Sequence, residues 1–301
     1  MIKPRVFIIL VNYNAYKDTI ECVESLRKID YLNYKIIIVD NASTNDSFEI
    51  LTRSLKDCII IKSKKNLGFA GGNNLGLRYA LDEGADYIML LNNDTLVEPN
   101  FLSNMLNSFH QDNKIGIVGC KIMYHPQKDI IWYGGGNINW FKFIGEHHGI
   151  KELDRGQCDE EKEVDFITGC CLLIKSSVIR RIGFLSEEYF MYFEDVDFCV
   201  KVKEAGYKVW YNSKSVIYHK VGLSGGGEES VFSIKWCTRN RLLFMKKYKN
   251  RVSKFTYILA NIFIYTTRWI RYIQYKMKGK NDKAEAIIEG IKEGMQLIMQ
   301  R

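Results

Sequence analysis

The first 120 residues alternate between short apolar segments and segments with helical periodicity. The apolar segments are rich in β-branched or aromatic residues and lie at 5–11, 35–40, 58–62 and 87–91. Between them, apolar residues recur at three- and four-residue spacing, at 16–29, 46–55 and 72–81. Strands that alternate with amphipathic helices predict an α/β fold with a mostly parallel, Rossmann-like sheet flanked by helices. A further helix after Pro99, a strand at 115–120 and a glycine-rich region of loops and hairpins at 124–165 are expected next.

Polar residues follow three of the predicted strands. Asn12 and Tyr13 follow the first, Asp40 ends the second, and Asn92-Asn93-Asp94 follows the fourth. Open α/β sheets bind ligands beyond the carboxyl ends of their strands, so these side chains are expected at one edge. A single carboxylate there, such as Asp94, suits a divalent metal.

Each of these motifs also has a structural interpretation. Asp40 could simply end a strand and cap the next helix, and Tyr13 could serve packing. The glycine-rich segment 65–74 lets backbone N–H groups approach a phosphate or sugar, but it could also build a tight turn. It is neither a G-x-G-x-x-G dinucleotide motif nor a P-loop.

An acidic cluster and a histidine stand out in the second half. Glu194, Asp195 and Asp197 follow a run of aromatic residues and open a predicted helix. The helix dipole favours carboxylates at that end, but three within four residues exceed what capping requires. His219 ends an apolar strand, where a histidine is either structural or a ligand.

Charge is distributed unevenly along the chain. Residues 231–301 carry 16 Lys or Arg against 4 Asp or Glu, whereas the rest of the chain carries 27 against 31. A basic tail next to a mildly acidic body predicts an anionic partner, either nucleic acid or a phospholipid surface.

Aromatic residues interleave with Lys and Arg in this tail, as is typical of interfacial helices. They are Phe255, Tyr257, Phe263, Tyr265, Trp269, Tyr272 and Tyr275. The apolar run at 255–267 has 13 residues, and a membrane span needs about 20. The tail is therefore expected to lie on a membrane, with packing on the rest of the chain or on a second subunit as the alternative.

Chain length and cysteine spacing indicate the domain organisation and the state of the thiols. The 301 residues suit one large domain with an appendage. The eight cysteines form no C-x-x-C pair and several lie in apolar segments, which predicts buried, reduced thiols. The N-terminus enters a strand almost directly, so no signal peptide is expected.

Taken together, the strand-end motifs, the segment 164–174 and the acidic cluster at 194–197 resemble the inverting glycosyltransferases of family 2. Their motifs occur here in the family's order, over roughly residues 3–245. Within the family the chain is most similar to rhamnosyltransferases of bacterial surface-polysaccharide synthesis. The resemblance implies a GT-A-type catalytic domain at 1–230, with a nucleotide-sugar half at about 1–120 and an acceptor half at 121–230. A basic helical tail at 231–301 then associates with membrane or forms an oligomer.

The resemblance also implies the donor-binding residues. Tyr13 would stack on a pyrimidine whose ring N–H is accepted by Asp40, and Asn92 would bond a ribose hydroxyl. The implied set is Asn12, Tyr13, Asp40, Asn66, Gly72, Asn92 and Asn93.

Metal and catalytic roles follow from the same resemblance. Asp94, the last residue of a D-x-D variant, and His219 would bind Mg²⁺ or Mn²⁺ bridging the donor diphosphate. Asp195 would take the proton of the acceptor hydroxyl, with Glu194 and Asp197 orienting it or the acceptor. Arg239 or Arg241 would stabilise the departing diphosphate.

The expected activity is transfer of a single sugar, because the Q-x-x-R-W motif and the spans of processive synthases are missing from the sequence. The expected donor is dTDP-rhamnose, or another UDP- or GDP-sugar, and the acceptor is a glycan or lipid-linked hydroxyl. The expected location is the cytoplasm, at the inner face of the cell membrane. Two other classes fit the sequence less well: a sugar nucleotidyltransferase, whose basic glycine-rich signature is missing, and a nucleic-acid binder, which would leave the acidic cluster unexplained. No nucleic-acid partner is therefore expected.

Overall fold

The computed structural model describes residues 3–221 and 229–299. The chain forms two compact units. The first contains residues 1–137, 147–190 and 194–221, and the second contains 138–146, 191–193 and 222–301.

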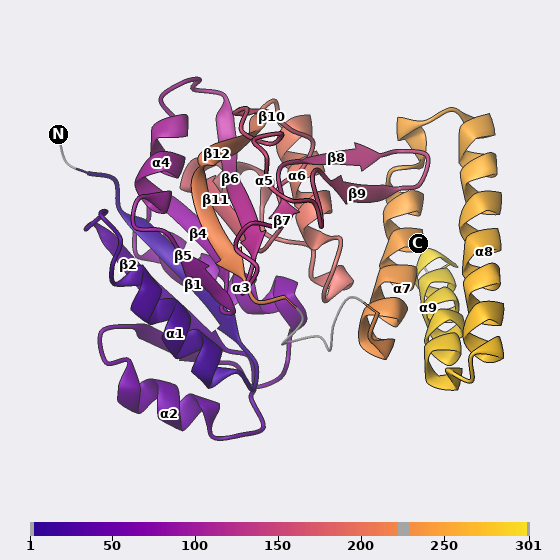
Figure 1. Cartoon of the computed structure of the whole chain (residues 1–301), viewed down its shortest axis with the longest axis horizontal. Helices are drawn as coiled ribbons and strands as arrows, with labels where there is room; N and C mark the ends of the chain where they lie inside the picture. The colour runs from indigo at the N-terminus through magenta and orange to yellow at the C-terminus, as the bar shows by residue number, and fades with distance from the viewer. Residues whose placement is uncertain (1–2, 222–228, 300–301) are drawn as a thin grey trace. The chain divides into compact units, whose positions relative to one another are not determined.

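Four parallel strands form one half of the sheet in the first unit (Figure 1). They are β1 (Val6–Asn12), β2 (Tyr34–Asp40), β3 (Ile59–Lys62) and β4 (Tyr87–Asn92). The sequence connecting them contains the helices α1 (Tyr16–Leu26), α2 (Ser47–Ser54) and α3 (Gly68–Asp82). β1 pairs with β2 on one side and β4 on the other, so Asn12 lies opposite Asp40 and Val11 opposite Asn92. The polar strand ends thus share one edge, as predicted.

The other half of the sheet is mixed. Its strands are β5 (Thr95–Val97), β6 (Ile115–Tyr124), β7 (Ile131–Tyr133), β10 (Lys162–Glu163), β11 (Cys171–Lys175) and β12 (Lys208–His219). The helices here are α4 (Phe101–Ser108), α5 (Ser176–Ile182), the 3₁₀ turn η1 (Glu187–Tyr189) and α6 (Glu194–Glu204). β11 runs antiparallel between β4 and β6, whereas β6 and β12 are parallel. β8 (Gly136–Asn139) and β9 (Ile144–His147) pair separately.

The predicted α/β fold class is confirmed. The central strands are continuous apolar runs because helices cover them, and the residues from Val6 to Leu10 have no exposed surface. The helix expected at 72–81 begins earlier, at Gly68. Its glycines allow close approach to β1: a Cβ at Gly76 would lie 2.6 Å from Ile9 Cγ2, and one at Gly72 would lie 2.9 Å from Val11 Cγ1. Six of the cysteines are buried, as predicted, whereas Cys58 and Cys237 are half-buried.

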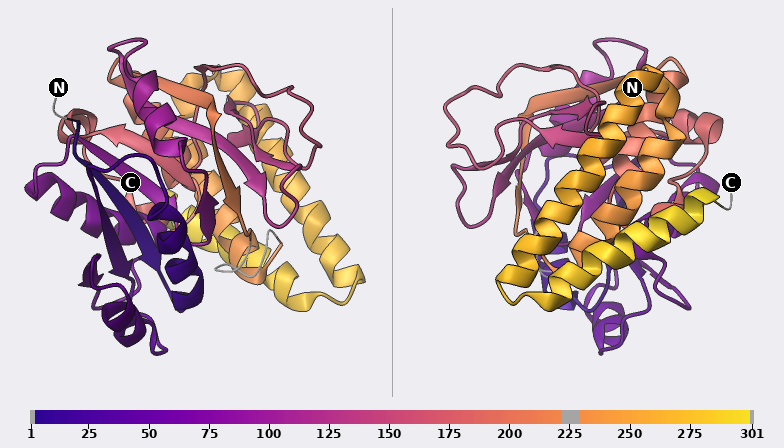
Figure 2. Two further views of the ribbon diagram at one scale, coloured as in Figure 1. Left: turned by 60° about the vertical axis from the view of Figure 1, so that its left-hand side comes forward. Right: turned by 90° about the vertical axis from the view of Figure 1, so that its right-hand side faces the viewer.

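The second unit contains three long helices. They are α7 (Val231–Lys247), α8 (Lys254–Met277) and α9 (Asn281–Met299), with a 3₁₀ turn η2 (Lys249–Arg251) before α8. The Ser230 and Ser253 hydroxyls cap α7 and α8 by accepting from the N–H groups of Ser233 and Thr256. The right-hand view of Figure 2 shows α9, in yellow, lying across α7 and α8.

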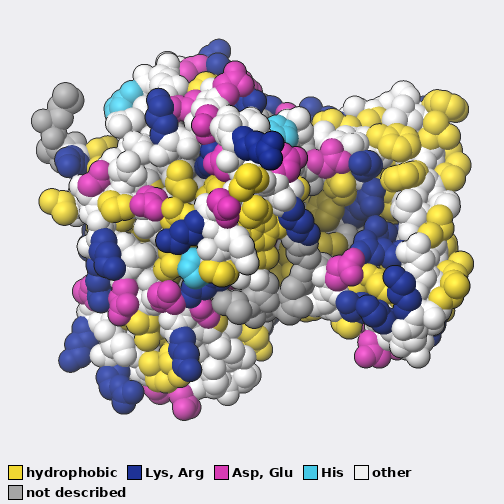
Figure 3. All heavy atoms as spheres, viewed as in Figure 1, with side chains coloured by type: hydrophobic (Ala, Val, Ile, Leu, Met, Phe, Trp, Pro, Cys, Tyr) yellow, Lys and Arg dark blue, Asp and Glu magenta, His cyan; other side chains and the backbone are white. Residues whose placement is uncertain are grey.

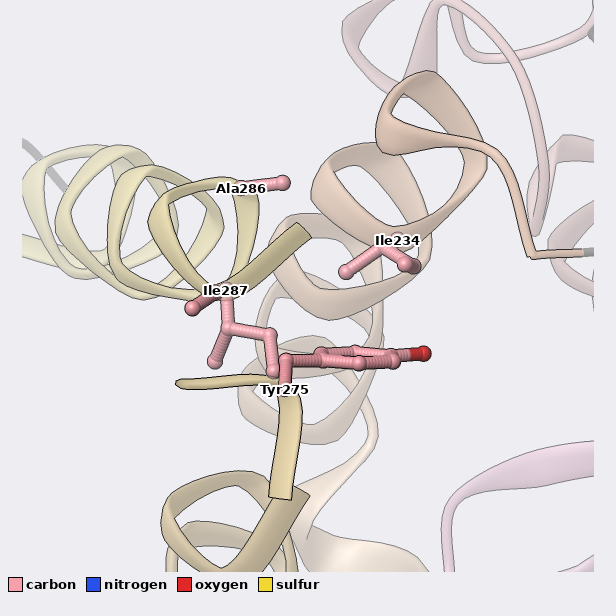
Figure 4. Packing of buried hydrophobic residues seen from close by; sticks show 5 residues of the cluster. Ile234, Tyr275, Ala286 and Ile287 are labelled. Carbon is pink, nitrogen blue, oxygen red and sulfur yellow. The ribbon is translucent and has the colours of Figure 1, made fainter. Parts of the chain in front are cut away.

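A buried apolar cluster holds these helices together. Ile234 of α7, Tyr275 of α8 and Ile287 of α9 point toward one another, with Ala286 beside them (Figure 4). None of the helices within residues 3–221 and 229–299 combines the length and apolarity needed to cross a bilayer.

Replacing Gly290 with Val should strongly destabilise the second unit. A Cβ at Gly290 would lie 2.6 Å from the backbone oxygen of Lys235, so α7 and α9 would have to separate. Overpacking of this kind costs about 1–3 kcal/mol or more. Chemical denaturation should show the loss, while Gln296→Val on the exposed surface of α9 should leave stability almost unchanged. Equal stability of both variants would contradict the close packing of α7 and α9.

Candidate active site

The ends of β1 and β2 are joined by a buried hydrogen-bond network. Asn12 Nδ2 donates to Asp40 Oδ1 at 2.9 Å and to Ser43 Oγ at 3.1 Å, and the Ser43 N–H donates to Asp40 Oδ2 at 3.2 Å. Asp40 has no exposed surface, whereas Tyr13 beside it is 39% exposed. α2 takes no side-chain cap hydrogen bond, so Asp40 shapes this edge and does not cap the helix. Its direct contact with a nucleotide base stays a prediction and requires the carboxylate to become accessible.

The glycine-rich turn is held by two asparagines. Asn41 Nδ2 donates to Asn66 Oδ1 at 3.1 Å and to the Gly68 oxygen at 3.0 Å, while its Oδ1 accepts from the Leu67 N–H. Gly68 has a φ of +68°, and a Cβ there would lie 2.2 Å from the oxygen of Phe190. Only glycine fits this close approach, which brings the turn to the segment preceding the acidic cluster.

Strand pairing places His219 next to Asp94. β5 and β12 are antiparallel with His219 opposite Thr95, the residue that follows Asp94. His219 Nε2 lies 3.2 Å from Asp94 Oδ1 and 3.4 Å from Asn92 Nδ2. Burial by itself would raise the pKa of Asp94, but the charge and hydrogen bond of His219 outweigh it and hold that pKa below its usual value. Asn93 points elsewhere and donates to the Thr19 hydroxyl at 2.9 Å.

The Asp94 and His219 pair fits a divalent cation held jointly with a ligand. The carboxylate oxygen and the imidazole nitrogen are both donors that Mg²⁺ or Mn²⁺ accepts, and both side chains are buried. His219 Nδ1 has no hydrogen-bond partner. In the part of the chain that the structure describes, no cluster of three or more His, Cys, Asp or Glu side chains suits a metal. Oxygens of water or of a bound ligand would complete the coordination of a cation held by this pair.

Two neighbouring residues before β11 connect this pair to the acidic cluster. The Asn92 N–H donates to the Cys170 oxygen at 2.9 Å. The Gly169 N–H donates to Asp195 Oδ2 at 2.8 Å. The predicted metal position and the predicted base are thus held by adjacent residues of one segment.

The three carboxylates of the cluster differ in their surroundings. Asp195 is partly exposed and accepts from the N–H groups of Gly169 and Val196, both at 2.8 Å. Burial raises its pKa, and these hydrogen bonds oppose part of the shift. Glu194 is almost completely buried, and its Oε2 has no partner. Burial and then the charge of Asp195 raise the pKa of Glu194 well above its usual range. Asp195 therefore ionises more readily than Glu194 and is better suited to act as a base.

Asp197 is held by other side chains of the first unit and has no exposed surface. Its partners are the hydroxyls of Ser186 and Tyr189, at 3.1 and 3.2 Å, and Lys201 Nζ at 3.3 Å. These contacts indicate a structural role, in which Asp197 anchors α6 to the turn at η1.

In the second unit, Asn240 of α7 holds the segment preceding the cluster. Its Nδ2 donates to the oxygens of Met191 and Tyr192 at 2.8 and 2.9 Å. Tyr192 and Phe193 both have positive φ, at 70° and 75°, a strained conformation that needs such support. Sequence reasoning missed Asn240, because nothing in its local pattern reveals a hydrogen bond to a segment about 50 residues away.

The two arginines predicted to act on a diphosphate are engaged within the second unit. Arg241 Nε donates to the Lys142 oxygen at 2.7 Å. Arg239 lies 3.9 Å from Glu293 and over the Trp236 ring. Their proposed action on a diphosphate stays a prediction.

The chain is similar to two proteins named as sugar transferases. The chain is 25% identical over 259 residues to the low-salt glycan biosynthesis hexosyltransferase Agl10 of Haloferax volcanii, covering 85% of this chain and 81% of that protein. It is 22% identical over 297 residues to the dTDP-rhamnosyl transferase RfbF of Shigella flexneri, covering 95% of each.

A solved structure of similar fold is the mannosyltransferase PcManGT from Pyrobaculum calidifontis in complex with GDP-Man and Mn²⁺. The TM-score is 0.62 at 15% identity, over 98% of this chain and 88% of that one. At this identity the likeness supports the fold alone, which is of the GT-A type expected from the sequence.

The sequence profile of one family, described as glycosyl transferase family 2, matches residues 7–183. The match covers more than half of the 301 residues. It includes the strand ends at Asn12, Asp40 and Asn92 and the segment that contains Gly169. The chain therefore belongs to glycosyl transferase family 2.

Proposed function

We propose that this glycosyltransferase is metal-dependent and inverting, and that it moves a single sugar from a nucleoside diphosphate donor to a hydroxyl of a glycan or lipid-linked acceptor. The observation that carries the proposal is the link from Asn92 through Cys170 and Gly169 to Asp195. This link supports the proposal that the paired Asp94 and His219 act in the same site as the Asp195 carboxylate.

The proposed reaction is a single displacement. The acceptor oxygen attacks the anomeric carbon from the face opposite the nucleotide, and the bond from that carbon to the diphosphate oxygen breaks. The bonding electron pair leaves with the diphosphate, and the hydroxyl proton passes to the Asp195 carboxylate. One displacement inverts the anomeric configuration.

The other residues of the site hold and orient the donor in this proposal. Tyr13 offers an exposed ring for stacking on the base, and it follows Asn12, which donates to Asp40. Asn66 and Gly72 belong to the glycine-rich turn and the helix it opens, and Asn92 is available for a ribose hydroxyl. A divalent cation bound by Asp94 and His219 would offset the negative charge of the departing diphosphate.

The proposed donor is dTDP-rhamnose, and the proposed setting is the synthesis of a bacterial cell-surface polysaccharide. RfbF, a dTDP-rhamnosyl transferase by name, supports this choice through its similarity over nearly the whole chain. The alternative is another UDP- or GDP-sugar, since PcManGT was solved with GDP-Man. We further propose a cytoplasmic enzyme that lies on the inner face of the membrane through its basic tail. A homo-oligomer formed through the tail is the alternative to membrane binding.

Thermal unfolding with a panel of nucleotide sugars tests both the identity of the donor and the metal dependence of its binding. A ligand that binds only the native state raises the melting temperature by mass action. We expect one donor to raise it in the presence of Mn²⁺ and not in the presence of a chelator. If no nucleotide sugar changes the melting temperature under either condition, the proposal is wrong.

The pH dependence of kcat/KM should reveal the base. Burial raises the pKa of Asp195 above its ordinary value of 3.8, and the protonated form cannot accept a proton. Activity should therefore be present above the raised pKa and be lost as pH falls through it, so the acidic limb should lie above that ordinary value. Initial rates at saturating Mn²⁺ across the acidic range measure the limb. A rate that stays flat down to about pH 4 would contradict Asp195, with its raised pKa, as the base.

A further inference from the structure

A basic pocket lies on α8 within the second unit. Its volume is about 380 Å³, and its lining includes Arg268, Arg271, Lys278 and Lys280. Arg271 forms an ion pair with Glu229, which also lines the pocket. Within residues 3–221 and 229–299, the other three cations have no acidic partner. The pocket therefore carries uncompensated positive charge.

Arg268 is the pocket cation whose positive charge is least compensated. Its Nε is buried without a hydrogen-bond acceptor, and one terminal nitrogen reaches only the Thr238 hydroxyl at 3.5 Å. Burial and then the charge of Arg271 lower the pKa of this guanidinium. An anion in the pocket would supply the missing acceptor.

An apolar stripe runs along α8 beside the pocket. Its exposed side chains recur at helical spacing and comprise Phe255, Ile258, Leu259, Ile262, Trp269, Ile270, Ile273 and Met277. Phe255 is 70% exposed and Ile262 58%. Ile270 belongs to both the stripe and the pocket lining. Figure 3 shows hydrophobic side chains along α8 and Lys or Arg side chains gathered beside them.

The charge of α8 favours a lipid surface over a second copy of the chain. The helix contains Lys254, Arg268, Arg271 and Lys276 but no Asp or Glu, so pairing two such helices would oppose like charges. Two acidic residues of α9, Glu289 and Glu293, already form ion pairs with Lys235 of α7. They are therefore less available to pair with the cations of a second copy. An anionic lipid layer matches both the apolar stripe and the adjoining positive charge.

We infer that the pocket binds the phosphate headgroup of an anionic membrane lipid while the apolar stripe of α8 lies in the lipid layer. This inference rests on the membrane docking included in the proposed function. Arg268 and Arg271 face the phosphate as hydrogen-bond donors, and Lys278 and Lys280 add charge at the end of the helix. The site thereby binds the anionic headgroup directly, in addition to the attraction exerted by the bulk charge of the surface.

Flotation of the full chain with vesicles tests the inference. Phosphatidylcholine vesicles with and without phosphatidylglycerol are compared at one salt concentration. The double variant Lys278→Gln/Lys280→Gln removes two exposed pocket cations, and Lys249→Gln/Lys292→Gln removes two exposed lysines outside the lining. We expect the pocket variant to bind phosphatidylglycerol vesicles roughly 30-fold more weakly, from about fivefold per lysine, and the matched control to lose much less.

If both double variants lose vesicle binding equally, the binding depends on bulk surface charge, and the proposed headgroup site in the pocket is wrong. Failure of the unchanged protein to float with phosphatidylglycerol vesicles would overturn both the pocket and the docking. Ile262→Ser/Ile273→Ser should abolish flotation by removing the stripe, and unchanged flotation would overturn its role. Transfer to a water-soluble acceptor, measured on the same samples, reports the proposed function separately, because membrane docking is not needed for that reaction.

Discussion

Asp195→Asn is expected to lower kcat by roughly 10²-fold or more while leaving donor binding largely intact. The amide has nearly the size of the carboxylate but cannot take the proton of the acceptor hydroxyl. Asp195 accepts two backbone N–H groups, from Gly169 and Val196, and an amide oxygen can replace only one of these acceptors. A stability loss of about 1–3 kcal/mol should therefore accompany the loss of turnover. Single-turnover kinetics with saturating donor, together with a denaturation curve, separates the two effects.

Glu194→Gln is the matched variant for this experiment. Glu194 is buried beside Asp195, and burial raises its pKa well above the usual range. Its neutral amide should therefore resemble the protonated acid, and much more of the turnover should remain. If Asp195→Asn retains full turnover while Glu194→Gln loses it, the two carboxylates have the opposite roles.

Asp94→Ala should abolish metal-dependent donor binding, and His219→Ala should weaken it less. The carboxylate is the charged member of the pair, and backbone dipoles alone would have to hold the diphosphate after its loss. Titration calorimetry of donor with Mn²⁺, repeated with chelator, measures the effect.

Glu98→Ala serves as the control for this prediction. Glu98 is also acidic and accepts from the hydroxyl of Tyr218, the residue before His219. Among the described residues, no hydrogen bond or ion pair joins Glu98 to Asp94 or His219, so donor affinity should keep its dependence on Mn²⁺. Donor binding by the unchanged protein that is indifferent to chelator would refute the metal site.

The parallel half of the fold could be predicted closely because its signals are local. Apolar strands, helical spacing and turn residues lie within short windows, and β1, β2 and β4 begin and end within one residue of the predicted ranges. The antiparallel direction of β11 could not be predicted, since Cys171–Lys175 is an apolar run that fits either direction. Its pairing with β4 depends on contacts about 80 residues apart.

In the candidate site, too, local patterns could be predicted and long-range contacts could not. Asp94 and His219 could be proposed individually, but their proximity depends on the pairing of β5 with β12. Long-range hydrogen bonds gave no local signal, and those of Gly169 to Asp195 and of Asn240 to Met191 are two such contacts. The sequence pattern predicts one interfacial group of tail aromatics, whereas the structure divides them. Tyr275 is buried against α9, and Phe255 is exposed.

The most direct test of the account is the anomeric configuration of the transferred sugar. NMR of the first product, formed from the donor selected by thermal unfolding and a soluble hydroxyl acceptor, gives that configuration from the one-bond carbon–proton coupling at the anomeric carbon. We predict a product of configuration opposite to that of the donor, formed with Mn²⁺ by the unchanged protein and not detectably by Asp94→Ala. A product of retained configuration, or equal product from Asp195→Asn, would contradict a single displacement with Asp195 as the base.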